Sequence, residues 1–208
     1  VRLQMVDRYD LGRQYMLWEF ATAVAGHILG INPFDQPDVE AAKIAAREAV
    51  AAYTETGRRP EAEAVPPTVG ALRSFLAMAR PGDYVALQAF VQPTAETTAA
   101  LQALRQRIRD AYRLATTVGF GPRFLHSTGQ LHKGDGGNGL FIQFVADDAQ
   151  DVPIPDEAGG ADSAITFSVL KAAQAAGDRQ ALLNKGRRFL RFHLGQEIVG
   201  GLEKLGQL

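Results

Sequence analysis

The 208-residue sequence contains no cysteine, which excludes disulfides, thiolate metal ligands and a cysteine nucleophile. It also lacks the run of roughly 18 apolar residues that a membrane-spanning helix requires. Neither sign of charge is in excess, because 22 Lys and Arg stand against 23 Asp and Glu. A net charge of -1 gives no overall attraction for nucleic acid or an anionic membrane. We therefore expect a cytoplasmic protein with neither of these partners.

What the sequence does contain is the composition of an ordinary globular protein, with 46% hydrophobic and 22% charged residues. The chain begins at Val1 rather than methionine, inside a segment of alternating character that predicts a strand over residues 1–6. That segment also lacks the pattern of a signal peptide. We expect a fragment of a longer protein.

Two helices are predicted in the first part of the chain. After Gly12, apolar residues recur on one helical stripe until Gly30, which provides a typical end. A second, alanine-rich helix follows Pro37 and ends at Gly57.

Residues 58–68 are rich in proline and charge, which predicts an exposed connection. We expect a first domain over residues 1–57, a linker over 58–68 and a second domain over 69–208. The alternative is that the connection is a surface loop within one compact domain.

Apolar patterns in the second part alternate between helix and strand. The predicted segments are helix 69–78, strand 83–92, helix 94–116, strand 140–146, helix 165–177 and strand 188–194. This order favours an α/β fold with mostly parallel strands, flanking helices and right-handed crossovers.

Gln36 and Lys43 form the first candidate site. They are seven residues apart, so on one helix they face the same way, roughly 10 Å apart along the axis. A partly desolvated lysine can act as an acid or stabilise an oxyanion. The alternative is a surface lysine paired with Glu40 or Glu48.

The second candidate site is the glycine-rich segment 119–139. Glycines let the backbone approach a ligand and form nests of N–H groups. Hydroxyl and basic side chains there could bind an oxyanion such as a sugar phosphate: Arg123, Ser127, Thr128, His132 and Lys133. Alternatively, the segment is a flexible hairpin with ordinary hydrogen-bonded histidines. No metal or cofactor is expected, because the histidine spacing fits no usual zinc pattern and no phosphate-binding loop motif is present.

The segment Gly30-Ile-Asn-Pro-Phe-Asp-Gln-Pro-Asp-Val-Glu-Ala-Ala-Lys43 resembles the C-terminal signature of phosphoglucose isomerases. Residues 19–26 resemble the helix that precedes it. The later stretch 121–134 is similar to the tail of a bacterial fusion in which transaldolase precedes a phosphoglucose isomerase domain. Together these resemblances cover most of the chain.

The resemblance implies a three-layer α/β fold of the sugar-isomerase (SIS) type and interconversion of glucose 6-phosphate with fructose 6-phosphate. Lys43 matches the family's active-site lysine, and Gln36 matches its substrate-contacting glutamine. Residues 131–138 resemble, more faintly, the segment that bears the ring-opening histidine. That histidine precedes the lysine motif in the family, whereas His132 follows it. His132 is therefore either catalytic or part of a non-catalytic repeat.

The family's proton-transferring glutamate belongs to a motif upstream of the lysine, and no segment here matches it. We therefore expect the C-terminal part of a phosphoglucose isomerase, inactive alone. Its partners would be a sugar phosphate and the missing isomerase and transaldolase parts; a homodimer stays open. The alternative is a non-catalytic sugar-phosphate-binding or assembly domain.

Overall fold

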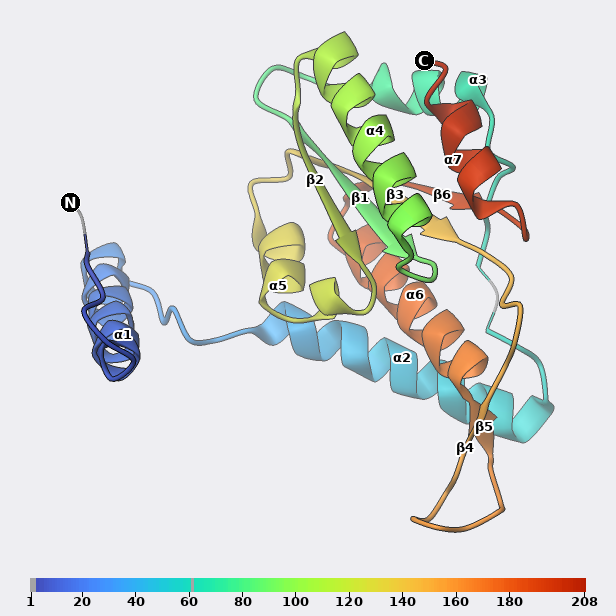
Figure 1. Ribbon diagram of the computed structural model, residues 1–208, viewed down its shortest axis with the longest axis horizontal. Helices are drawn as coiled ribbons and strands as arrows, with labels where there is room; N and C mark the ends of the chain where they lie inside the picture. Colours follow the sequence, from blue (N-terminus) through green and yellow to red (C-terminus); the bar gives the residue numbers. More distant parts are fainter. Residues whose placement is uncertain (1–2, 61) are drawn as a thin grey trace. The chain divides into compact units, whose positions relative to one another are not determined.

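The computed structural model describes residues 3–60 and 62–208 (Figure 1). The chain divides into two compact units, Val1–Gln36 and Pro37–Leu208. The predicted domains 1–57 and 69–208, with their linker, stay a prediction about which parts fold alone. None of the described helices combines the length and apolar character needed to cross a bilayer.

The first unit is built around α1 (Asp10–Leu29), which confirms the predicted helix. The helix ends at Gly30, whose left-handed backbone (φ 68°) lets its N–H bond back to the last turn. Gly26 lies under the ring of Pro33, where an added Cβ would come within 2.5 Å of the ring. This close contact folds the following turn back onto the helix end.

The strand predicted over residues 1–6 is wrong for residues 3–6, which form no strand; residues 1–2 lie outside the described residues. Instead, the backbone before α1 forms hydrogen bonds with acidic side chains at the start of that helix. The Val6 N–H donates to the Asp10 carboxylate (2.5 Å), and Asp7 accepts from the N–H of Tyr9 (2.8 Å). Local capping by acids outweighs an alternation of only six residues.

The second unit starts with α2 (Pro37–Thr56), which confirms the predicted alanine-rich helix, and Gly57 follows it with φ 68°. Along its length α2 packs against α6 (Phe167–Asn184), as Figure 1 shows. Gly177 makes this contact close, because an added Cβ would lie 2.8 Å from the carbonyl oxygen of Ala42 and from the backbone nitrogen of Ala46. Small residues on both helices thus permit near contact of their backbones.

A four-stranded, fully parallel sheet forms the centre of the second unit, in the order β2-β1-β3-β6. The strands are β1 (Tyr84–Phe90), β2 (Ala115–Phe120), β3 (Gly139–Val145) and β6 (Arg188–His193). A separate two-stranded ribbon joins β4 (Pro153–Ile154) and β5 (Ile165–Thr166). The predicted α/β class with parallel strands is confirmed.

Helices cover both faces of this sheet, giving three layers consistent with the SIS-like fold. On one face lie α3 (Val69–Leu76), α4 (Ala95–Tyr112) and α7 (Ile198–Leu205), and on the other α5 (Ser127–Gly134), α6 and α2. The first face is built on a large apolar cluster; its largest members include Leu72, Leu87, Leu104, Ile108, Ile142, Phe144 and Phe192. The second face carries polar side chains in its interior, among them Gln88, Gln143 and Arg191.

The helix predicted over residues 94–116 is too long. It ends at Tyr112, Arg113 takes a left-handed conformation (φ 56°), and residues from Ala115 form β2. The helix α7 was not predicted, and α6 continues beyond its predicted end to Asn184.

The connection over residues 58–68 is bound to the outer edge of β6. Val65 donates its N–H to the carbonyl of Arg191 (2.9 Å) and accepts from the N–H of His193 (3.0 Å). This bridge holds the preceding residues, including Arg59, beside the carboxyl end of the sheet.

Candidate functional site

Gln36 and Lys43, the pair expected to share one ligand, belong to different units. Gln36 ends the first unit and precedes α2, whereas Lys43 lies in the second turn of α2 with an exposed side chain. The prediction that the two side chains meet one ligand stays a prediction. Glu40, considered as a partner for Lys43, instead accepts from Arg47 (2.5 Å).

Lys43 lines a cavity of about 560 Å³ within the second unit. His126 lies on its wall as well, together with the amide of Gln174. The remaining wall is largely apolar and includes Ala46, Val50, Leu125, Ile165 and Leu170. An ammonium and an imidazole beside an apolar wall can orient an organic anion.

The start of α2 is fixed by a polar cluster at its first turn. The backbone N–H of Asp38 donates to the amide oxygen of Gln130 on α5 (2.9 Å), and the Gln130 amide donates back to the Asp38 carboxylate (3.1 Å). Lys185 pairs with the same carboxylate at 2.8 Å. These bonds hold the helix that carries Lys43 against α5.

The glycine-rich segment 119–139, for which a flexible hairpin was the alternative, folds mostly into regular secondary structure. It forms the end of β2, a short 3-10 turn η1 (Arg123–Leu125) and the helix α5. Three of the predicted ligand residues line one cavity of about 750 Å³: Arg123, Thr128 and His132. Ser127, the first residue of α5, is exposed.

Lys133 does not line that cavity. Its side chain is 1% exposed, and its ammonium donates to the Asp178 carboxylate at 2.6 Å. Burial raises the pKa of the Asp178 carboxyl, while the Lys133 ammonium opposes this rise. Lys133 would have to leave this ion pair to bind a ligand; its predicted ligand-binding role stays a prediction.

His132 is buried against the rings of Tyr84 and Phe141. Burial, reinforced by the nearby Lys133 ammonium, lowers the pKa of His132 to about 4. The imidazole is therefore neutral at pH 7, with its Nδ1 3.4 Å from the amide nitrogen of Gln88. A neutral imidazole can exchange a proton or a hydrogen bond with a ligand but offers no charge to a phosphate.

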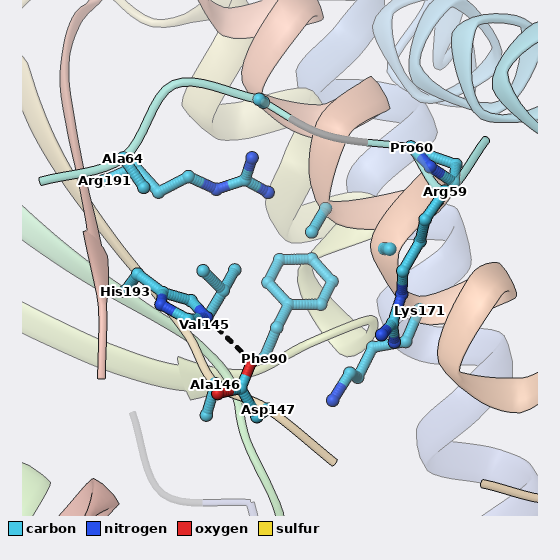
Figure 2. Close-up of a pocket in the computed structure, with 13 residues that line it drawn as sticks. Arg59, Pro60, Ala64, Phe90, Val145, Ala146, Asp147, Lys171, Arg191 and His193 are labelled. Atoms are coloured by element: carbon cyan, nitrogen blue, oxygen red, sulfur yellow. Dashed lines mark hydrogen bonds and ion pairs between the residues drawn. The ribbon is translucent and has the colours of Figure 1, made fainter. Parts of the chain in front are cut away.

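A further cavity of about 450 Å³ opens where β1, β3 and β6 end. Four basic side chains line it: Arg59, Lys171, Arg191 and His193 (Figure 2). Phe90, Val145 and Ala175 form apolar parts of the wall, and Asp147 contributes a carboxylate. In open α/β sheets, ligands bind beyond the carboxyl ends of the strands, where the connections diverge to opposite faces. This cavity has that position, since β1 leads to α4 on one face and β3 leads to α6 on the other.

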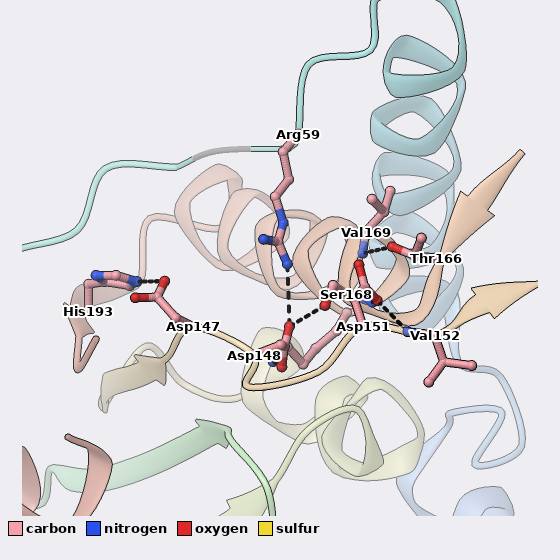
Figure 3. Close-up of polar contacts among 10 residues, drawn as sticks. Arg59, Asp147, Asp148, Asp151, Val152, Thr166, Ser168, Val169 and His193 are labelled. Atoms are coloured by element: carbon pink, nitrogen blue, oxygen red, sulfur yellow. Dashed lines mark hydrogen bonds and ion pairs between the residues drawn. The ribbon is translucent and has the colours of Figure 1, made fainter. Parts of the chain in front are cut away.

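Two aspartates after β3 orient the basic side chains of this sheet-edge cavity (Figure 3). Asp148 accepts from Arg59 (3.3 Å), from the Ser168 hydroxyl (2.5 Å) and from the Lys171 ammonium. These donors keep the pKa of the Asp148 carboxyl low against the effect of its burial. Asp147 lies 3.1 Å from the imidazole of His193.

Sequence reasoning missed these residues because they come from four separate segments, and none stands in a motif. The only available signal was the position of His193 and Asp147 at the ends of predicted strands. Among the described residues, no three histidine or acid side chains gather closely enough to hold a metal ion.

No family model matches the chain. Short similarities connect it to glucose-6-phosphate isomerases: 46% identity over 43 residues in Shouchella clausii, 44% over 43 in Enterococcus faecalis and 51% over 37 in Heliobacterium modesticaldum. These stretches cover 18–21% of this chain and 8–10% of those enzymes. The chain thus contains a region similar to sugar isomerases, and in particular to glucose-6-phosphate isomerase. It spans about a tenth of the length of the curated relatives it matches.

A solved structure of a hypothetical protein from Thermus thermophilus can be superposed with a TM-score of 0.49 and 18% sequence identity. The superposition covers 80% of this chain and 43% of the other.

Proposed function

We propose that the chain is the C-terminal region of a glucose-6-phosphate isomerase and contributes Lys43 and Gln36 to a site completed by an upstream part of the enzyme. The supporting observation is the stretch of 37 to 43 residues that is 42–51% identical to these isomerases. The exposed ammonium of Lys43, on the wall of a cavity, is compatible with contact to a substrate.

Aldose–ketose isomerisation needs a base that carries a proton between C2 and C1, and positive charge near the enediolate oxygen. In the proposed enzyme, Lys43 supplies this charge and Gln36 binds a substrate hydroxyl. The upstream part supplies the carboxylate base. We propose that this part can be fused to a transaldolase, and that the isolated chain has no isomerase activity.

The test measures conversion of fructose 6-phosphate by the chain alone and by the longer protein that includes the upstream isomerase part. We expect no turnover by the chain alone, and a loss of about 10²-fold or more in kcat when Lys43 is changed to Ala in the longer protein. Lys204→Ala, an exposed lysine on α7, is the control. Turnover by the isolated chain, or full activity of Lys43→Ala, would contradict the proposal.

The second candidate function is non-catalytic binding of a sugar phosphate, favoured by the common cavity of Arg123, Thr128 and His132. Titration of the chain with glucose 6-phosphate distinguishes the two. If this cavity holds the ligand, Arg123→Gln weakens binding while Lys43→Ala does not.

A further inference from the structure

The two outer strands of the parallel sheet are protected to different degrees. At one edge, Val65 pairs with β6 through both of its backbone groups. At the other edge, β2 pairs with β1, and within residues 3–60 and 62–208 no further segment bridges to it (Figure 1). The sequence of β2, Ala-Thr-Thr-Val-Gly-Phe, contains neither the charges nor the proline that commonly block such an edge. This edge is thus open to pairing with another strand.

The cavity of about 750 Å³ that includes Arg123 follows this open edge, and we call it the β2 groove. Every residue of β2 except Thr116 lines it. One wall comes from α4 and includes Leu101, whereas the other comes from η1 and α5 and includes Phe124 and Leu131. Because α4 and α5 lie on opposite faces of the sheet, the groove can cover both faces of an added strand.

The side chains of the groove indicate what an added strand carries toward it. Its lining is largely apolar and includes Val118 and Phe120 of β2. Leu131 on α5 is 65% exposed, so a partner can bury apolar surface there. Successive side chains of a strand point to opposite faces, and pockets beside a sheet edge select them in alternation. The β2 groove therefore suits an extended peptide with apolar side chains at alternate positions.

Three arginines make this edge positive. Arg113 lies two residues before β2, Arg123 follows β2 in the groove, and Arg105 donates to a backbone carbonyl of β2 (3.5 Å). None of the three forms an ion pair with a carboxylate of the described residues. In the described lining, the single carboxylate is that of Asp135, and it already pairs with Arg187 (3.0 Å). The edge thus has positive charge that an acidic partner can balance.

From this geometry we propose that the β2 groove binds an extended acidic peptide of another protein by β-strand addition. The peptide backbone pairs with β2, alternate apolar side chains enter the groove, and carboxylates near the peptide ends meet Arg113 and Arg123. A second copy of this chain fits less well, because an antiparallel pair of β2 strands would bring Arg113 of one copy near Arg123 of the other. The inference does not rest on the proposed isomerase function, since the groove includes neither Lys43 nor Gln36.

The experiment measures fluorescence anisotropy of a labelled peptide in which valine alternates with threonine and aspartate stands at both ends. We expect the 208-residue chain to bind this peptide, with an affinity that falls with added salt. A peptide with lysine in place of aspartate should bind at least about tenfold more weakly. A peptide with a fully N-methylated backbone should not bind, because it cannot donate hydrogen bonds to β2. Amide hydrogen exchange should slow more along β2 than along β6 when the acidic peptide is added.

Variants of exposed side chains locate the site without disturbing the core. Arg113→Gln, Arg123→Gln and Leu131→Glu should each weaken binding of the acidic peptide about three- to tenfold. Arg107→Gln on α4 and Ile44→Glu on α2 change exposed side chains outside the groove and are the matched controls. Both should leave the affinity unchanged.

Several results would overturn the assignment. They are failure of the acidic peptide to bind, equal binding of the lysine or N-methylated peptide, and an equal loss of affinity in a control variant. Sedimentation of the chain alone tests the other occupant: dimerisation that Leu131→Glu abolishes, without peptide binding, would assign the groove to a second copy instead.

Discussion

Lys43 and Lys133 are both lysines that sequence patterns associated with a phosphorylated ligand, yet the structure places them in opposite environments. Lys43 is exposed on α2 beside a cavity, whereas Lys133 is 1% exposed and paired with Asp178. The difference lies in the neighbouring layer: α2 presents Lys43 outward, and α5 inserts Lys133 toward α6. A basic residue within a glycine-rich segment can therefore form a buried ion pair with another helix instead of binding a ligand.

We expect the largest difference between the two lysines when Lys133 is changed to Met. The variant leaves the Asp178 carboxyl buried without its partner, so we expect the free energy of unfolding to fall by about 3–5 kcal/mol. The control Lys43→Met removes an exposed side chain and should change it by less than about 0.5 kcal/mol. Chemical denaturation of both variants measures the difference.

A double variant, Lys133→Met with Asp178→Leu, tests the cause. Removing both charges should restore most of the lost stability, because neither member of the buried pair is left unpaired. Equal stabilities of the two single lysine variants would contradict the described burial of Lys133.

The next effect concerns pH and the buried neighbour of Lys133. The pKa of His132 is lowered from 6.5 to about 4, so between these values the unfolded chain binds the proton and the folded protein does not. Stability contributed by the neutral imidazole is present above pH 6.5 and is lost as the pH falls toward 4. Over this interval we expect the wild type to lose about 2–3 kcal/mol more than His132→Gln.

Urea denaturation of wild type and His132→Gln at about pH 6.5, 5 and 4 measures this difference. Exposed carboxyl groups contribute equally to both proteins and cancel in the comparison. Parallel pH profiles would show that His132 is protonated as easily when folded as when unfolded.

A smaller change in stability is expected from the contact of α2 and α6, which supports the helix that carries Lys43. Gly177→Ala places a methyl group against the backbone of α2 at Ala42 and Ala46, which should cost about 1–2 kcal/mol. Gly200→Ala in α7 meets nothing within 4 Å and should be neutral or slightly stabilising. Thermal unfolding of the two alanine variants compares them directly, and equal melting temperatures would contradict the close contact of α2 with α6.

Much of the fold could be predicted because long apolar segments have a spacing of apolar residues that distinguishes helix from strand. The buried strands β1 and β3 and the alanine-rich helix α2 are of this kind. The strand β2 was missed because the preceding helix ends without the usual glycine: Arg113 itself adopts the left-handed conformation. A sequence pattern offers no signal for such an end.

The candidate sites also differ in how far the sequence could indicate them. Lys43 could be proposed as a site residue because it stands in a contiguous segment that resembles a known signature. Arg59, Lys171 and Arg191 come together only because parallel strands end at one edge and the connection after α2 returns to it. Residues that come together only through the order of strands in the sheet form no local motif in the sequence.

The bridge between Val65 and β6 has a consequence for association with other chains. Outer strands of sheets expose unpaired N–H and C=O groups, which can recruit a strand from another molecule and initiate aggregation. Val65 occupies these groups at Arg191 and His193. The short, proline-rich segment thus covers the outer edge of β6 and blocks the addition of a strand from another molecule. Shortening the segment would expose this edge, on which fibrils or domain-swapped dimers can nucleate.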